Sequence, residues 1–429
     1  MLNKIIKVTC TELSYQGLGV CREHAKPIFV HDLFVGEKAK VQIYKETTKF
    51  AFAKVVELIT KSEHRDKSYS CINSAPLINL AYNQQLAFKE NYLKSHLIRN
   101  LNINESVIDA FQPAIQETHY RNKIKVALKL IDNILHYGEY DSNSNNIIVT
   151  DDIKIQNNIS LNGTLDKIIN ALNQYSQKSH RYKVLEAFRE ITLRINHINE
   201  VQVLFNLSDD QNVYSEIINI LKSIDNIVQL YFYQNQKLKL IFEKKPFSIL
   251  INKKSFDVHI NSFFQINIEM ATKIFNDMHK KVAENFKQNF IDLYCGVGII
   301  SQLVAYKRHK ILGVDISKEA IAAAKDNAYV NGFRSAKYIN GDVYQVIDLY
   351  NLDINNTIVV LDPPRAGLDV KLTKWLNNIN SFIYMSCELR SFTRDLQNLQ
   401  QQGFKINYIK GYDMFPNTPH FEIVAYLSK

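Results

Sequence analysis

Cys387 and Glu422 carry the side chains best suited to covalent chemistry. Cys387 follows a predicted buried strand, residues 381–385, and precedes a predicted helix, whose positive amino end is expected to lower the thiol pKa. Glu422 opens the last predicted strand and could act as a general base. Alternatively, Cys387 is a small buried apolar residue and Glu422 an exposed strand residue. A cysteine and a carboxylate would also suit a thiol hydrolase, but only His420 lies nearby to serve it.

Polar residues recur where the predicted strands of the last third of the chain end. They are Asp292, Tyr294, Gly296, Gly298, Asp315, Asp342 and Asp362. Ligands of an open parallel sheet bind beyond such ends. The turn lacks the third glycine of a dinucleotide site, because position 301 is Ser301. Several carboxylates suit a ligand with a ribose, an adenine and a positive charge: Asp315 is placed to bind ribose hydroxyls, and Asp342 could reach the adenine amino group. Each aspartate alone could equally be a cap; the set favours binding.

The elements that position these residues alternate between strands and helices from residue 286 onward. The strands are continuously hydrophobic, which indicates a parallel sheet covered on both faces. The last two strands, near 404–409 and 421–427, have no helix between them and are predicted to form a hairpin at one edge. The predicted fold class is therefore α/β. The strand count resembles the Rossmann-like, seven-stranded fold of S-adenosyl-L-methionine (SAM)-dependent methyltransferases.

Two further regions precede this sheet. Residues 3–59 contain short strands at intervals of about 8–12 residues, which predicts a small antiparallel β-barrel. Residues 61–110 are mostly helical in pattern, and residues 121–263 alternate strands with helices near 160–176 and 213–224. We therefore predict a barrel over residues 1–60, a central α+β domain over 61–255 with a helical entry at 61–118, and a catalytic domain over 256–429.

Charge and cysteine content narrow the function classes. The net charge is +9, and residues 1–130 hold 19 Lys and Arg against 12 Asp and Glu, which suits either a polyanion-binding front end or a solubilising surface. No apolar run approaches the ~18 residues of a membrane span, and the N-terminus does not resemble a signal peptide. The five cysteines are scattered, which argues against a disulfide scaffold and fits the cytoplasm.

Six segments together resemble one family, the RNA uracil-C5 methyltransferases. They are Ser262 to Asn267, Asp292 to Gly298, Gly313 to Asp315, Asp362-Pro363-Pro364-Arg365, Ser386-Cys387 with Arg394-Asp395, and Asp413 to Pro416 with His420 and Glu422. Their order and spacing match over about 170 residues. The first 60 residues look like the TRAM domain, a small RNA-binding barrel that precedes the enzyme in the ribosomal RNA branch of this family.

The resemblance implies a mechanism and a set of site residues. Cys387 would add to carbon 6 of uracil, carbon 5 would take the methyl group of SAM, and Glu422 would remove the carbon 5 proton. The residues that line the cofactor site would be Gln265, Tyr294, Asp315, Asp342 and Asp362. Asp362 and Arg365 could instead contact the base. The uridine would have to be unstacked to enter the pocket.

Two departures from the family pattern concern metal binding and the nucleophile. Many relatives carry a four-cysteine iron–sulfur site after the barrel, but here only Cys71 remains, and residues 72–77 read Ile-Asn-Ser-Ala-Pro-Leu. We therefore expect no iron–sulfur cluster and no metal site. Relatives often have Asn-Pro after the nucleophile, whereas this chain has Glu388-Leu389.

The substrate expected first is 23S ribosomal RNA, because a barrel precedes the enzyme, and the alternative is the T-loop of transfer RNA. A non-catalytic RNA-binding protein of the same fold is a further alternative, which the presence of Cys387, Glu422 and the cofactor carboxylates argues against. An amino-group DNA methyltransferase would be expected to have an aromatic residue at position 365 and would not need Cys387. Neither a membrane nor an obligate protein partner is expected, and the sequence leaves the target uridine and the oligomeric state open.

Overall fold

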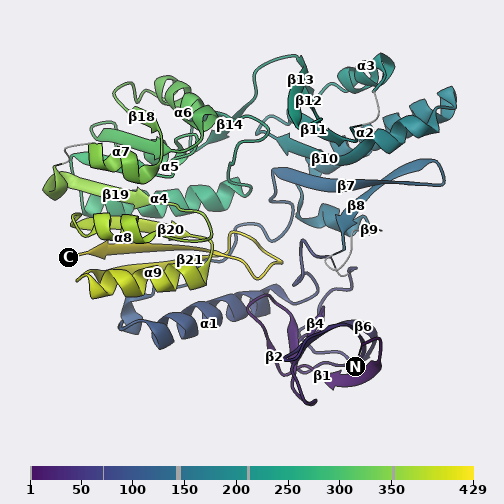
Figure 1. Ribbon diagram of the computed structural model, residues 1–429, viewed down its shortest axis with the longest axis horizontal. Helices are drawn as coiled ribbons and strands as arrows, with labels where there is room; N and C mark the ends of the chain where they lie inside the picture. Colours follow the sequence, from purple (N-terminus) through teal and green to yellow (C-terminus); the bar gives the residue numbers. More distant parts are fainter. Residues whose placement is uncertain (1, 71, 142–145, 210–212, 350–352) are drawn as a thin grey trace.

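Three large β-sheets, which follow one another along the chain, organise the structure (Figure 1). The computed structural model describes residues 2–70, 72–141, 146–209, 213–349 and 353–429. A two-stranded sheet of β14 (Ser248–Ile251) and β15 (Lys254–Asp257) connects the second large sheet to the third. Short 3-10 helices lie at Glu105–Val107, Asp152–Gln156, Tyr182–Ala187 and Ile354–Asn356.

The first sheet curls around a small apolar core, as expected for a barrel. Its strands are β1 (Ile5–Thr9), β2 (Glu12–Leu13), β3 (Gly19–Cys21), β4 (Ile28–His31), β5 (Lys38–Glu46) and β6 (Ala51–Thr60), in the order β1-β5-β6-β4-β3-β2. Side chains of β5 alternate, so that Ala39, Val41 and Ile43 are buried, whereas Lys40 and Gln42 between them lie half-buried on the opposite face. Cys10 and Cys21 belong to this core, where burial raises the pKa of both thiols.

The second sheet is mostly antiparallel and carries two helices. Its strands are β7 (Lys123–Ile131), β8 (Ile134–Tyr140), β9 (Ile147–Val149), β10 (Phe188–Ile195), β11 (Val201–Leu207), β12 (Ile227–Gln234) and β13 (Lys237–Glu243), in the order β13-β12-β11-β10-β7-β8-β9. Helices α2 (Ile159–Ser179) and α3 (Ser215–Ser223) lie where the sequence predicted them. Leu161, Leu165, Leu172 and Leu221 of these helices pack into one core with the sheet.

The third sheet is the predicted seven-stranded α/β sheet. Its strands are β16 (Asn289–Leu293), β17 (Lys310–Asp315), β18 (Lys337–Asn340), β19 (Thr357–Leu361), β20 (Ser381–Ser386), β21 (Lys405–Tyr412) and β22 (Glu422–Ser428), in the order β18-β17-β16-β19-β20-β22-β21. The first five strands of this order are parallel, whereas β22 is antiparallel to both β20 and β21. The predicted edge hairpin is therefore β21–β22, with β21 outermost.

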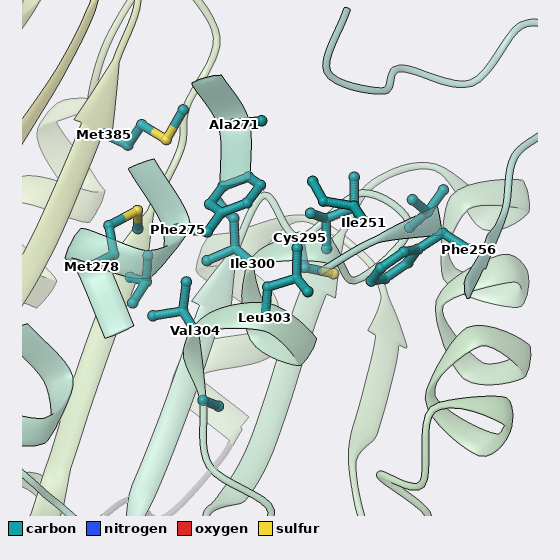
Figure 2. Close-up of a cluster of buried hydrophobic side chains, with 14 of the residues drawn as sticks. Ile251, Phe256, Ala271, Phe275, Met278, Cys295, Ile300, Leu303, Val304 and Met385 are labelled. Carbon is teal, nitrogen blue, oxygen red and sulfur yellow. The ribbon is translucent and has the colours of Figure 1, made fainter. Parts of the chain in front are cut away.

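Helices cover both faces of this sheet. They are α4 (Ile268–Glu284), α5 (Ile299–Val304) and α6 (Lys318–Val330) on one face, and α7 (Val343–Leu349), α8 (Val370–Leu376) and α9 (Leu389–Gln401) on the other. Figure 2 shows part of the first apolar layer, in which Cys295 lies among side chains such as Ile300 and Leu303. Burial raises the pKa of the Cys295 thiol well above its usual value, so this cysteine is a packing residue.

Helix α1 (Tyr82–Asn100) packs on the third sheet rather than on the second. Its Leu93 and Leu97 join the same apolar cluster as Phe392 and Leu396 of α9. The predicted helical entry at 61–118 thus contributes to the core of the predicted catalytic domain, and the boundaries at 60 and 255 stay a prediction.

Among the described residues, none of the helices combines the length and the apolar character that a membrane span requires. In the same part of the chain, no three His, Cys, Asp or Glu side chains are grouped so that they could hold a metal ion. Cys71, which marks the position of the iron–sulfur site in relatives, lies outside the described residues.

Candidate active site

The sheet register brings Cys387 and Glu422 together. Ser386, the last residue of β20, pairs with Ile423 of β22. Cys387 therefore lies just beyond the end of one strand, beside Glu422 at the start of its antiparallel neighbour. The Cys387 side chain is half-buried, whereas Glu422 is buried and its Oε2 has no hydrogen-bond partner. The two residues that the sequence selected for chemistry face the same space.

The expectation that the helix amino end would lower the thiol pKa is wrong for this structure. Burial raises the pKa of Cys387 to about 11, and the negative charges of Glu422 and Asp362 add to the rise. Arg365 opposes them, because its positive charge lies near the sulfur and lowers the pKa. Both carboxylates were selected from the sequence for other roles, but only the helix was considered when the thiol pKa was assessed. At neutral pH Cys387 is therefore a protonated thiol.

Glu422 and Asp362 form a coupled pair of carboxylates. Burial raises the pKa of both groups, and the charge of Asp362 raises that of Glu422 further, while Arg365 lowers it. Like charges resist ionising together, so these two carboxyls keep their protons to a higher pH than exposed carboxylates do. Proton transfer at carbon and sulfur needs such groups, and here they border the thiol.

Asp315 ties the glycine turn to the end of β17. Its Oδ2 accepts the backbone N–H of Gly296 at 2.9 Å, and its Oδ1 accepts that of Ser317 at 2.8 Å. Tyr294 and Gly296 adopt positive φ angles of 66° and 52°, which turn the chain sharply after β16. A side chain at Gly296 would meet no atom within 4 Å, so the turn opens onto free space next to Asp315.

Asp292, Asp315 and Asp362 lie near one another at this end of the sheet, and their negative charges interact. Asp292 is fully buried; its Oδ2 accepts the N–H of Ser301 at 2.8 Å, but its Oδ1 has no partner. Burial and the charges of Asp362 and Asp315 raise the pKa of Asp292 to about 7. An orphaned buried oxygen among like charges fits a ligand that carries a positive charge, as the sulfonium of SAM does.

Two residues that follow strands at this edge of the sheet were treated differently by the sequence analysis. Asp342, a predicted adenine contact, follows β18, and its Oδ1 accepts the N–H of Tyr344 at 2.9 Å, so it caps α7 as well. Ile316 follows Asp315 and is 77% exposed, although it is a large apolar residue. Sequence reasoning missed Ile316; the signal was an apolar residue directly after a strand-end carboxylate.

The segment that carries Gln265 is positioned by the second sheet. Gln265 is buried, and its carbonyl accepts a hydrogen bond at 3.0 Å from the side-chain amide of Asn122. The buried guanidinium of Arg194 donates to the carbonyls of His259 at 2.7 Å and of Ser262 at 2.6 Å. These contacts fix the loop before α4, and with it the backbone at Gln265. Sequence reasoning did not identify Asn122 or Arg194 as partners of this segment.

The loop before Glu422, residues 413–421, is held by α1 through a buried ion pair. Lys89 Nζ lies 2.5 Å from Asp413 Oδ1, and both side chains are completely buried. Tyr82 donates to Asp413 Oδ2 at 2.9 Å, and Lys89 also donates to the carbonyl of Phe415 at 3.1 Å. In Figure 1 this loop extends from the third sheet into the middle of the molecule, between the barrel and the second sheet. Sequence reasoning missed Lys89 and Tyr82, because lysine is expected on the exposed face of a helix.

A seven-stranded α/β sheet with carboxylates at its carboxyl ends defines the class of SAM-dependent methyltransferases. The chain belongs to the tRNA (uracil-5-)-methyltransferase family, whose model matches residues 81–429, and a TRAM domain matches residues 1–56. The resemblance seen in the sequence is thereby confirmed, and the chain is a SAM-dependent RNA uracil-C5 methyltransferase.

Relatives and a solved structure match over nearly the whole length. A relative from Enterococcus faecalis is 26% identical over 448 residues, covering 100% of this chain and 98% of its own. One from Oceanobacillus iheyensis is 27% identical over 449 residues, covering 99% and 97%. Both are described as uncharacterized RNA methyltransferases. The crystal structure of Pyrococcus abyssi tRNA (uracil-54, C5)-methyltransferase in complex with S-adenosyl-L-homocysteine shares the fold, with a TM-score of 0.76 and 23% identity over 98% of this chain and 100% of that one.

The buried ion pair predicts a large loss of stability when one partner is removed. Lys89→Met leaves the Asp413 carboxylate buried without a cation, so we expect the free energy of unfolding to fall by about 3–5 kcal/mol. Urea denaturation measures this loss. Lys94→Met is the matched control, because Lys94 on the same helix pairs with Glu90 near the surface, and its loss should cost about 0.5 kcal/mol or less. Equal losses in the two variants would contradict the assignment.

The raised thiol pKa predicts slow alkylation of Cys387 at neutral pH. In a Cys71→Ser background, the rate with iodoacetamide should rise about tenfold per pH unit up to the pKa of about 11. Glu422→Gln removes a negative charge near the sulfur, so it should lower this pKa and shift the profile to lower pH. Cys387→Ala gives the background rate. A midpoint below about 8 in the starting protein would refute the burial argument.

Proposed function

We propose that the chain methylates carbon 5 of uridine in 23S ribosomal RNA through a covalent bond between Cys387 and carbon 6 of the base. The observation that supports these roles is the convergence of a thiol, a guanidinium and two coupled carboxylates at one end of the sheet. Addition of a thiolate is needed because carbon 5 of uracil is too weak a nucleophile on its own.

Gln265, Tyr294, Asp315, Asp342 and Asp362 would hold the cofactor. Asp315 offers carboxylate oxygens to the ribose, and the open side of Gly296 leaves room beside it. The negative charges of Asp292 and Asp362 would lie opposite the positive charge of the cofactor's sulfonium. When bound, SAM supplies an electrophilic methyl group on a sulfonium.

In the first step Cys387 attacks carbon 6. Its thiol proton passes to Asp362, which burial makes able to keep a proton, while Glu422 is in its ionised form for the second step. The sulfur–carbon 6 bond forms, and the electrons of the carbon 5–carbon 6 double bond move toward the carbonyl oxygen at carbon 4. Arg365 stabilises the thiolate before the attack, and it lies close enough to orient the base. Carbon 5, now nucleophilic, takes the methyl group.

In the second step Glu422 removes the proton from carbon 5. The electrons of that bond restore the double bond between carbons 5 and 6, the bond to sulfur breaks, and Cys387 leaves as a thiolate. Glu422 needs its ionised form for this step. A positive charge bound beside the pair favours that form, because it lowers the pKa of both carboxylates.

RNA binding is assigned to the barrel, residues 1–60, and to the central region, residues 61–255, with 256–429 as the catalytic part. The barrel supports this with an aromatic group on its surface: Phe29, Phe50 and Phe52 contact one another, and Lys45 lies 5.8 Å from the Phe52 ring. Half-buried aromatic rings next to lysines suit stacking with unpaired bases and contact with phosphates.

Transfer RNA is the second candidate substrate. The barrel favours ribosomal RNA, because the sequence resembles the branch in which a TRAM domain precedes the enzyme. The structural match to a transfer RNA enzyme favours transfer RNA as the substrate, because that enzyme aligns over its whole length. Unmodified transcripts of both RNAs, incubated with radiolabelled SAM, separate the two, and nuclease mapping of the label identifies the uridine. Label in transfer RNA alone would overturn the ribosomal assignment.

Replacing the nucleophile should abolish catalysis without emptying the cofactor site. We expect Cys387→Ala to reduce methylation to background, while the Kd for SAM, measured by calorimetry, stays within about twofold, because the sulfur does not carry the cofactor contacts. Cys295→Ala is the matched control at a buried cysteine, and it should remain active. Unchanged turnover in Cys387→Ala would remove the proposed nucleophile.

Replacing the base should trap the adduct. With Glu422→Gln the carbon 5 proton stays in place, so the bond between Cys387 and the methylated base persists. A denaturing gel should then show a protein band shifted by the RNA, and the double variant with Cys387→Ala should not show it. Normal turnover by Glu422→Gln would refute its role as base.

A further inference from the structure

An arginine-rich groove of about 440 Å³ lies between the barrel and the amino end of α9. Its polar and aromatic lining residues are Tyr15, Arg365, Glu388, Arg390, Ser391 and Arg394. Three guanidinium groups thus face one carboxylate. Arg365 belongs both to this groove and to the Cys387 site, because it lines the groove and its positive charge acts on Cys387 and Glu422. The groove is therefore the immediate neighbour of the proposed uridine pocket.

Tyr15 is held in the groove by a packed turn of the barrel. Residues 14–18 close on themselves, since the N–H of Ser14 donates to the carbonyl of Leu18 and that of Gly17 to the carbonyl of Ser14, both at 2.8 Å. Gly17 has a φ of 75°, and a Cβ there would lie 3.0 Å from Leu77 and 3.6 Å from Pro419. The turn thus packs against the segment after the barrel and the loop that precedes Glu422.

The Tyr15 ring and the Arg390 guanidinium already form a stack. The guanidinium carbon lies 3.5 Å from the ring centroid, and Arg390 is also hydrogen-bonded to Tyr92 of α1. Tyr15 remains 40% exposed, although it is a large aromatic residue. Aromatic rings and guanidinium planes are the surfaces on which unpaired RNA bases stack. This stack joins the barrel to the catalytic sheet.

The groove's charge is available to an anion. Arg394 donates to Asp395 at 2.7 Å and to the carbonyl of Ala366 at 2.8 Å, and its side chain is still 53% exposed. The single carboxylate, Glu388, accepts the backbone N–H of Arg390 at 3.2 Å and thereby caps α9. Arg365 and Arg390 are both exposed. A phosphodiester is the group that several exposed arginines recognise best.

We propose that this groove binds the nucleotide adjacent to the target uridine, with its base stacked on the Tyr15–Arg390 pair and its phosphate on Arg365 and Arg390. The inference rests on the proposed function, because it needs a uridine inserted next to Cys387. An unstacked uridine leaves its neighbour without a stacking partner, and the Tyr15–Arg390 stack replaces that partner. It also gives the barrel a direct part in positioning the base, beyond general affinity for RNA.

The test compares RNA binding by variants of the Tyr15–Arg390 stack. With the transcript that the wild-type chain methylates, Tyr15→Ala and Arg390→Ala should each raise the Kd, measured by fluorescence anisotropy, about tenfold. Tyr15→Phe keeps the ring and should bind within about twofold of wild type. Arg334→Ala is the matched control, because Arg334 stacks on the exposed Tyr329 at 5.0 Å in another part of the surface. Arg334→Ala should bind the transcript with the wild-type Kd.

A second measurement locates the phosphate. Methylphosphonate linkages placed singly around the mapped uridine remove one phosphate charge at a time. At the linkage that the groove binds, this change should weaken RNA binding by the wild-type chain and leave RNA binding by Arg390→Ala unaffected. The inference would be overturned if Tyr15→Ala and Arg390→Ala bound RNA with the wild-type Kd. It would also be overturned if every linkage lowered the RNA affinity of the wild-type chain and of Arg390→Ala equally. Failure of the proposed function is a separate result, since the wild-type chain would then form no 5-methyluridine in either transcript.

Discussion

The geometry of the site depends on one buried ion pair, Lys89 with Asp413. Two charges without access to water are costly, and here the cost is offset by a short contact and by added hydrogen bonds from Tyr82 and to Phe415. The pair fixes the loop that returns the chain from β21 to β22, and Glu422 is the first residue of β22. A helix near the start of the chain therefore sets the direction of a carboxylate near its end.

A second set of buried polar contacts acts in the same way from the second sheet. Asn122 and Arg194 hold the segment before α4, and Tyr120 and Gln156 both donate to the carbonyl of Pro416, each at 3.2 Å. The carboxyl ends of the parallel strands alone would leave these two loops free. The outer parts of the chain supply the donors that fix them. The same parts are proposed to hold the RNA, so binding and catalysis share one rigid support.

The sequence could predict what depends on local pattern. Continuous apolar strands indicated the covered sheet, and the family resemblance paired Cys387 with Glu422, which the strand register brings together. It could not predict contacts that depend on distant partners. Lys89 and Asp413 are 324 positions apart, and nothing in the helical pattern of 82–100 distinguishes a buried lysine from an exposed one. The thiol pKa was misjudged because the helix amino end was considered without the burial of the sulfur and the charges of Glu422 and Asp362.

That error reveals how the pocket is kept unreactive. Burial and like charges favour the protonated forms of the Cys387 thiol and of the Asp362 and Glu422 carboxyls, so the proposed nucleophile and the proposed base are both held in their less reactive forms. Arg365 only partly opposes this, because one guanidinium faces two carboxylates and a thiol. A cationic ligand beside Asp292 and Asp362 would shift all of these equilibria toward the ionised forms. Reactivity would then appear only when the methyl donor is in place, which protects the thiol from oxidation and from alkylation in the absence of substrate.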